Sequence, residues 1–66
     1  MKVITAVKKY LKTDMEIFVE SVSSGSLVKI NKDKDIHLEL GGLIINSKVH
    51  HIESIESMGM ITIYVK

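Results

Sequence analysis

The chain has 66 residues, of which 45% are hydrophobic, and carries nine lysines against eight acidic residues, for a net charge of +1 at pH 7. This length allows a single domain, residues 1–66, near the lower limit for folding without a disulfide, a metal or a partner subunit. The absence of cysteine excludes disulfides and thiolate metal sites, and the small net charge gives no electrostatic signature of nucleic-acid binding. Association with further copies is the remaining common aid to folding, so we expect a homo-oligomer.

Membrane attachment and export are not expected from this sequence. No apolar run approaches the ~20 residues of a membrane span, and the apolar stretch after Lys2 is too short for a signal peptide. We therefore expect a cytoplasmic protein. Ten isoleucines and nine lysines without any arginine indicate an AT-rich coding sequence, which is typical of a low-GC bacterium or its phage.

Residues 2–12 form the first element, and two interpretations of it remain open. At helical period the apolar side chains fall on one arc and the lysines on the other, which predicts a short amphipathic helix. The β-branched residues of the same stretch favour a strand. As a helix, the segment is expected to cover the sheet, although basic amphipathic helices are also typical of membrane-surface or partner helices.

A first pair of strands is predicted at residues 15–22 and 27–31. Ser24 and Gly25 between them are typical turn residues. A two-residue turn at this point sets Val22 against Leu27 and Glu20 against Lys29, so that an acid meets a base. A short loop, residues 32–34, leads to the next strand.

The stretch from Asp35 to Val49 is predicted to be the central hairpin of the fold. Gly41 and Gly42 supply the positive φ that a two-residue turn requires, and this turn joins strands at 35–40 and 43–49. The resulting register gathers apolar side chains on one face. The predicted core face of the whole sheet holds Met15, Ile17, Val19, Val28, Ile30, Ile36, Leu38, Leu40, Leu43, Ile45 and Val49.

Beyond Val49 the alternation of apolar and polar residues weakens. A bulge near His50 and His51 would restore it. Ile52, Ile55 and Met58 lie three residues apart, which predicts one helical or 3₁₀ turn, and Gly59 is expected to end it. The last strand, residues 60–65, is predicted to point three side chains inward: Ile61, Ile63 and Val65.

These elements predict a mainly β, single-domain fold, an antiparallel meander or partly open barrel with a short N-terminal amphipathic helix. Their order resembles small barrels of the SH3-like and Sm-like kind, in which a brief 3₁₀ turn precedes the closing strand. The RNA-binding loops of Sm-type barrels have no counterpart in this sequence, so RNA binding is not carried over.

Apolar side chains also occur on the face that the hairpins leave towards water. The candidates for a protein interface are Val22, Leu27, Ile44, Met60 and Tyr64. An exposed patch of this kind usually marks a contact surface. The competing interpretation is that the N-terminal helix covers it.

Other residues of the same face are candidates for ligand binding: Phe18, Lys29, His37, Asn46 and Lys48. An aromatic ring beside lysines is typical of a surface that stacks bases or holds an anion. The alternative is a solvated face of mixed charge, since acidic residues share it.

Catalytic signatures are absent from the sequence. None of the seven serines lies in a nucleophile elbow, the carboxylates are scattered, and the three histidines lack the spacing of a metal site. We therefore predict no enzyme activity, no metal and no cofactor.

The expected function is that of a non-catalytic binding protein that self-associates. Its ligand is expected to be a protein partner or a small anionic ligand such as a nucleotide, as for a phage or bacterial inhibitor or sequestering protein. The alternative is a single-stranded nucleic-acid-binding small barrel of the Sm-like or OB-like kind.

Overall fold

The computed structural model describes residues 1–66 except for the side chain of Leu43, and it contains three short helices, four strands and a 3₁₀ turn. In chain order the elements are α1 (Val3–Tyr10), β1 (Glu16–Ser21), β2 (Leu27–Lys29), α2 (Ile36–Leu40), α3 (Gly42–Ile45), β3 (Val49–Ile55), the 3₁₀ turn η1 (Glu56–Met58) and β4 (Met60–Val65).

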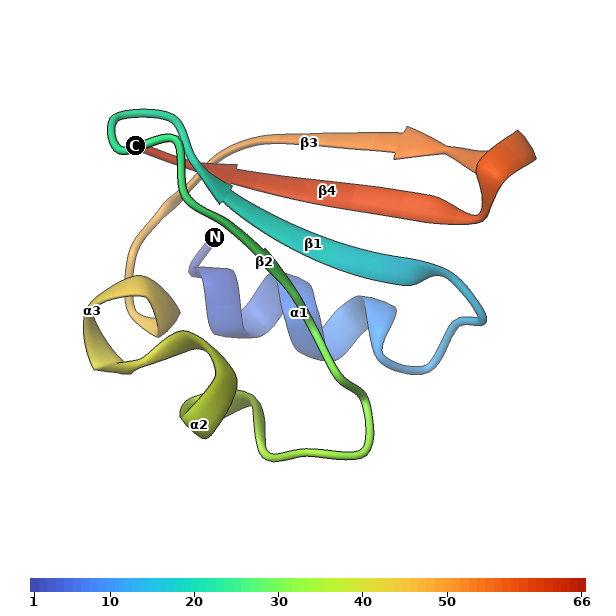
Figure 1. Ribbon diagram of the computed structural model, residues 1–66, viewed down its shortest axis with the longest axis horizontal. Coiled ribbons are helices and arrows are strands. Elements are labelled where there is room, and N and C mark those ends of the chain that lie inside the picture. Colours follow the sequence, from blue (N-terminus) through green and yellow to red (C-terminus); the bar gives the residue numbers. More distant parts are fainter.

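The four strands form one open, mixed sheet in the order β2-β1-β4-β3 (Figure 1). Its two central strands, β1 and β4, run parallel, and each pairs on its other side with its own antiparallel neighbour. The fold is therefore two hairpins joined side by side through a parallel pair. The mainly β prediction is confirmed, whereas the antiparallel meander is wrong, and closure into an SH3-like or Sm-like barrel is not confirmed.

Helix α1 packs against one face of the sheet, on the same side as α2 and α3 (Figure 1). Val3, Ala6 and Val7 are spaced along one face of α1 and are fully buried. They meet Ile17 and Ile63 from the two central strands in a single core. The predicted amphipathic helix is confirmed, as is the expectation that it covers the sheet.

The first hairpin is confirmed, with a register two residues away from the predicted one. Val19 lies opposite Val28 and Phe18 opposite Lys29, because the turn spans four residues, 22–25, instead of two. A shift of two keeps every side chain on its predicted face. The expected pairings of Glu20 with Lys29 and of Val22 with Leu27 are nevertheless wrong, because Leu27 lies opposite Glu20 and Val22 belongs to the turn.

The central hairpin predicted from Asp35 to Val49 is wrong. Residues 36–40 and 42–45 form the two short helices α2 and α3, and Gly41, with φ of 75°, connects them. The side chain of Asp35 caps α2 by accepting a hydrogen bond of 2.9 Å from the backbone N–H of His37. Ile36 and Leu40, four residues apart, are buried together on one side of this helix.

Leu38 shows the consequence for the predicted core. It points into solvent with 84% of its surface exposed, so its assignment to the core is wrong. The other predicted core residues are buried or packed against the core. The prediction for Leu43 falls on a side chain that lies outside the described part of the structure.

The C-terminal part of the chain confirms three predictions. The register of β3 against β4 shifts between Val49 and His51, as a bulge requires. The 3₁₀ turn η1 ends at Gly59, whose φ of 63° and ψ of 36° are left-handed. In β4 the predicted inward residues are buried. Strand β3 itself was not predicted, and the assignment of Ile52 and Ile55 to the turn is wrong, because both belong to β3 and the turn spans only Glu56–Met58.

None of the helices in the described chain is long and apolar enough to cross a bilayer.

Candidate functional site

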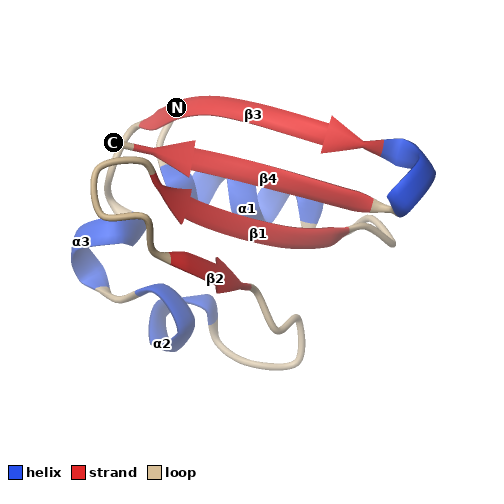
Figure 2. Cartoon of the chain, turned by 45° about the horizontal axis from the view of Figure 1, so that its top comes forward, coloured by secondary structure: helices blue, strands red, loops and turns tan.

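The face of the sheet turned away from α1 is left uncovered by the rest of the described chain (Figure 2). Alternation along the strands places the following side chains on this open face: Glu16, Phe18, Glu20, Leu27, Lys29, His51, Glu53, Ile55, Met60, Thr62 and Tyr64. We refer to this set as the open face.

Phe18 occupies the centre of the open face, on the central strand β1. It lies directly between Lys29 and Thr62 in the ladder. Its diagonal neighbours across the strands are Leu27 on β2 and two side chains on β4, Met60 and Tyr64. Phe18 is half-buried by these neighbours, whereas Leu27 is 57% exposed. The sheet therefore presents a contiguous apolar centre built around one aromatic ring.

Carboxylates border this apolar centre. Glu16 and Glu20 flank Phe18 along β1, and Glu53 lies on the edge strand β3 in the same cross-strand row. Lys29 is the one lysine on the open face, and its Nζ lies 3.4 Å from Oε1 of Glu16. Both side chains of this ion pair are more than half exposed, so it contributes little to stability. The open face is therefore acidic, with three carboxylates against one lysine.

A small polar cluster joins β4 to β3. The rings of Tyr64 and His51 stack with centroids 5.9 Å apart. The hydroxyl of Tyr64 donates to Oε2 of Glu53 at 3.4 Å, and Nε2 of His51 lies 3.3 Å from Oε1 of the same carboxylate. Desolvation of the phenol and the nearby charges of Glu53 and Glu20 raise the pKa of Tyr64 above its ordinary value of 10.0.

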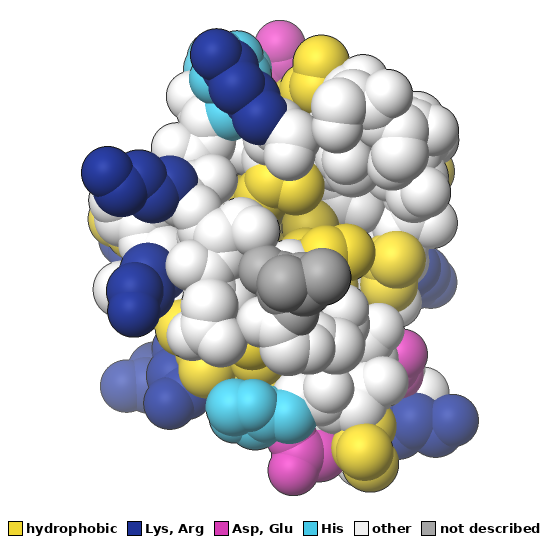
Figure 3. Space-filling model, turned by 90° about the vertical axis from the view of Figure 1, so that its left-hand side faces the viewer, with side chains coloured by type: hydrophobic (Ala, Val, Ile, Leu, Met, Phe, Trp, Pro, Cys, Tyr) yellow, Lys and Arg dark blue, Asp and Glu magenta, His cyan; other side chains and the backbone are white. Residues whose placement is uncertain are grey.

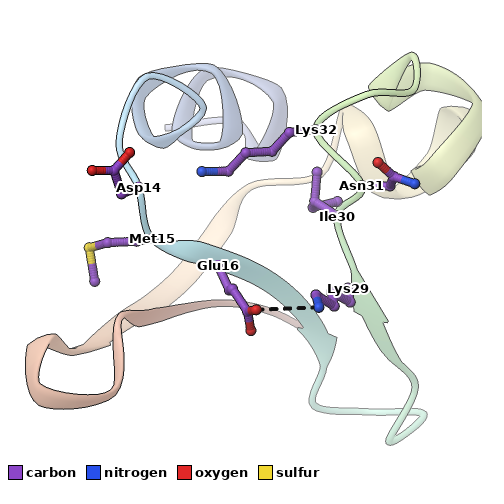
Figure 4. A pocket seen from close by; sticks show the side chains of 7 residues that line it. All are labelled: Asp14, Met15, Glu16, Lys29, Ile30, Asn31 and Lys32. Carbon is purple, nitrogen blue, oxygen red and sulfur yellow. Dashed lines mark hydrogen bonds and ion pairs between the residues drawn. The ribbon is translucent and has the colours of Figure 1, made fainter.

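A shallow pocket of about 470 Å³ opens beside the open face, where β1 begins and β2 ends (Figure 4). The Glu16–Lys29 ion pair lies at its border. Lys32 extends across it from the loop after β2, and its Nζ donates to the backbone carbonyl of Thr13. Both lysines of this pocket already have partners, so it does not offer a preformed anion site.

A second pocket, of about 390 Å³, lies where β3 begins and the chain ends. Its side chains include Lys48, His50 and Lys66, with no acidic residue among them. All three are exposed, so the pocket is basic and open to solvent.

The structure brings some of the predicted site residues together and separates others. Phe18, Lys29, Leu27, Met60 and Tyr64 meet on the open face. This joins three interface candidates to two ligand-binding candidates in one surface.

The remaining candidates lie elsewhere. Val22 is exposed in the turn after β1, and Ile44 packs against the core from α3. His37 belongs to α2, and the side-chain amide of Asn46, which follows α3, donates to the carbonyl of Gly42 at the start of that helix. Figure 3 shows the side of the molecule on which α2 and α3 lie, where lysines line one flank and scattered hydrophobic side chains reach the surface.

Three residues of the open face were not anticipated: His51, Glu53 and Ile55. They belong to β3. At the end of this strand the apolar Ile55 points outward and the polar Ser54 points inward, which is the reverse of the usual alternation. Their outward position follows only once the bulge is placed between Val49 and His51.

Among the described residues, no group of three or more histidine, aspartate or glutamate side chains is placed to hold a metal ion. Comparison with models of known protein families, with curated proteins and with solved structures finds no match to this chain.

Proposed function

We propose that this chain is a non-catalytic binding protein that self-associates and binds a protein partner through the open face. The observation that carries the proposal is the position of Phe18, at the centre of an uncovered sheet face and bordered by carboxylates. An apolar, aromatic centre within a polar border is the usual anatomy of a protein–protein interface. Binding in this way does not depend on closure of the sheet into a barrel.

The charges of the open face favour a particular kind of partner. With Glu16, Glu20 and Glu53 against Lys29, the face complements a surface that is apolar in the middle and basic around it. A standard interface covers about 800 Å² per partner, which is close to a fifth of the 4467 Å² surface of this chain. One face of so small a protein is therefore enough, and we propose that it acts as an inhibitor or sequestering protein in the cytoplasm of a low-GC bacterium or its phage.

The alternative is binding of single-stranded nucleic acid. Phe18 and Tyr64 lie diagonally on the two central strands, an arrangement on which bases can stack. The same three carboxylates disfavour it, because affinity for nucleic acid depends on neutralising phosphates. A small anionic ligand is better suited to the basic pocket of Lys48, His50 and Lys66.

Site-specific photocrosslinking in the native host tests the proposal. A photoreactive amino acid replaces Thr62, in the middle of the open face, and in a matched control replaces Lys8, which is exposed on α1. We expect position 62 to give a discrete adduct with one protein, identified by mass spectrometry, and position 8 not to give it. The adduct should disappear when Phe18→Ala is added.

The contrary outcomes are equally specific. Adducts of the same pattern from both positions would contradict a partner on the open face. If purified protein binds a fluorescent single-stranded oligonucleotide with an affinity that falls steeply with salt, and position 62 crosslinks to nucleic acid, the alternative holds instead.

A further inference from the structure

Strand β3 has an edge that the rest of the described chain leaves mostly unpaired. β3 is the last strand of the sheet on its side. The N-terminal residues cover only its beginning, through a bridge between Lys2 and Lys48 and a hydrogen bond of 2.7 Å from the N–H of Val49 to the carbonyl of Met1. The edge from His50 to Ile55 therefore presents backbone donors and acceptors to solvent, which invites another strand.

The sequence of this edge is complementary to itself when reversed. We infer that a second copy of this chain pairs antiparallel with β3, with Ile52 of one copy opposite Ile52 of the other. His51 then stands opposite Glu53 of the second copy, and the twofold axis repeats this contact. An imidazole opposite a carboxylate is favourable across a strand pair, either as a hydrogen bond or as an ion pair.

Neighbouring registers lack this complementarity. Pairing centred on Glu53 sets the two Glu53 carboxylates against each other, and pairing centred on Ser54 sets Glu53 opposite Ile55. Moving the partner strand by a single position, so that Ile52 stands opposite Glu53, would set a side chain of the helix side against one of the open face. The register centred on Ile52 uses His50 to Ser54 of both copies, which keeps the second strand clear of Met1 beside Val49.

Burial on the other side of the sheet supports the same register. The side chain of Ile52 lies on the helix side, opposite Ile63, and is only partly buried. In the pair, the two Ile52 side chains adjoin across the twofold axis and remove each other's apolar surface from water. Two copies joined through the open face are disfavoured instead, because each face carries three carboxylates against one lysine and the two faces therefore have the same net charge.

This inference deepens the proposed function and rests on its self-association, while the partner bound by the open face is independent of it. Because the twofold axis of such a pair is perpendicular to the sheet, the eight strands form one continuous sheet with both open faces on the same side. The dimer would thus offer two binding faces to a partner, with the affinity gain of bivalent binding where that partner presents two sites.

Sedimentation equilibrium between 5 and 500 µM tests the pairing. A contact of five residues a side predicts weak association, with a Kd of roughly 10–100 µM. Glu53→Lys should raise that Kd at least about tenfold, because each His51 loses the carboxylate opposite it and faces an ammonium group instead. The swap His51→Glu with Glu53→Lys should restore it to within about threefold. Asp33→Lys, an equal charge change in the loop after β2, should leave it unchanged.

Disulfide formation tests the register without relying on charge variants. The chain has no cysteine, so a single one reports unambiguously. Ile52→Cys places two thiols directly opposite each other, within the Cα distance that a disulfide accepts. Ser54→Cys, on the same strand and the same face, places them about 13 Å apart. We expect Ile52→Cys to oxidise rapidly to a dimer and Ser54→Cys to remain mostly monomeric.

The results separate failure of this inference from failure of the proposed function. If the wild-type protein dimerises but its Kd is the same in both charge variants, or if the two cysteine variants oxidise equally, the β3 pairing is overturned and self-association remains. A strict monomer at 500 µM overturns both the pairing and self-association. Photocrosslinking through the open face is unaffected by either result.

Discussion

Tyr64 is the residue at which the open face and the edge strand β3 meet. Its hydroxyl donates to Glu53 and its ring stacks on His51. Desolvation of the phenol and the charges of Glu53 and Glu20 raise its pKa above 10.0. The neutral phenol is therefore favoured by folding: its contribution to stability is complete below about pH 10 and is lost as the pH rises through the raised pKa.

Ultraviolet absorbance of the phenolate measures this shift. With Tyr10→Phe as the background, Tyr64 is the only tyrosine, and we expect its titration midpoint to lie above 10.0. Adding Glu53→Gln should lower the midpoint towards 10, because the neighbouring charge is removed. Lys34→Gln, in the loop before α2, is a control that should leave it in place. A midpoint unmoved by Glu53→Gln would contradict the contact.

Leu38 shows how far the sequence alone decides the burial of a residue. The run from Asp35 to Leu40 alternates polar and apolar side chains, which fits a strand, yet Ile36 and Leu40 are also four residues apart, which fits one side of a helix. Leu38 is inside in the first interpretation and outside in the second. The structure has it 84% exposed, so the apolar spacing of four prevailed over the alternation.

At the scale of the element, Asp35 is the signal that distinguishes the two interpretations. Aspartate directly before an apolar residue is a frequent N-cap, and its carboxylate accepts the N–H of His37 at 2.9 Å. We expect Asp35→Ala to reduce the free energy of unfolding by about 1 kcal/mol. Asp35→Ser, which keeps a capping oxygen, should reduce the free energy of unfolding by only a few tenths of a kcal/mol.

Urea denaturation of the three proteins measures the effect of the cap. Strand pairing in this stretch would not need an oxygen at position 35, so equal midpoints for the alanine and serine variants would contradict a capped helix. The two short helices have little stability of their own. They depend on burying Ile36, Leu40 and Ile45 in the shared core.

The order of the strands belongs to the whole molecule, and local patterns do not specify it. Turn residues predict which neighbours in sequence form hairpins, and the hairpin of β1 and β2 was found in this way. The parallel pairing of Glu16–Ser21 with Met60–Val65 joins segments about forty residues apart. This pairing brings Ile17 of β1 and Ile63 of β4 together under α1 in one core, and no turn signal encodes it.

The open face was partly predictable for the same reason. Phe18, Lys29 and Tyr64 received their outward positions from alternation along β1, β2 and β4, where the faces were correctly assigned. His37 and Asn46 were assigned to the same surface through the central hairpin. Because that hairpin is replaced by α2 and α3, neither residue lies on the open face. His51 and Glu53 were missed because the bulge between Val49 and His51 changes which residues of β3 point outward.

The parallel pair also predicts how the molecule unfolds. Neither hairpin covers its own apolar face, because Ile17 of the first and Ile63 of the second are buried only in the core that both share with α1. Loss of any one layer exposes that core, so the 66 residues should unfold in a single cooperative transition.

Amide signals from α1, β2 and β3, followed by NMR across a urea series, measure this directly. We expect the signals of Lys8, Val28 and Ile52 to disappear with one common midpoint at low micromolar concentration. At several hundred micromolar the common midpoint should rise, because pairing of two copies adds stability by mass action. Earlier loss of the Lys8 signal would instead mean that α1 detaches from an independently stable sheet, contrary to a core shared by both layers.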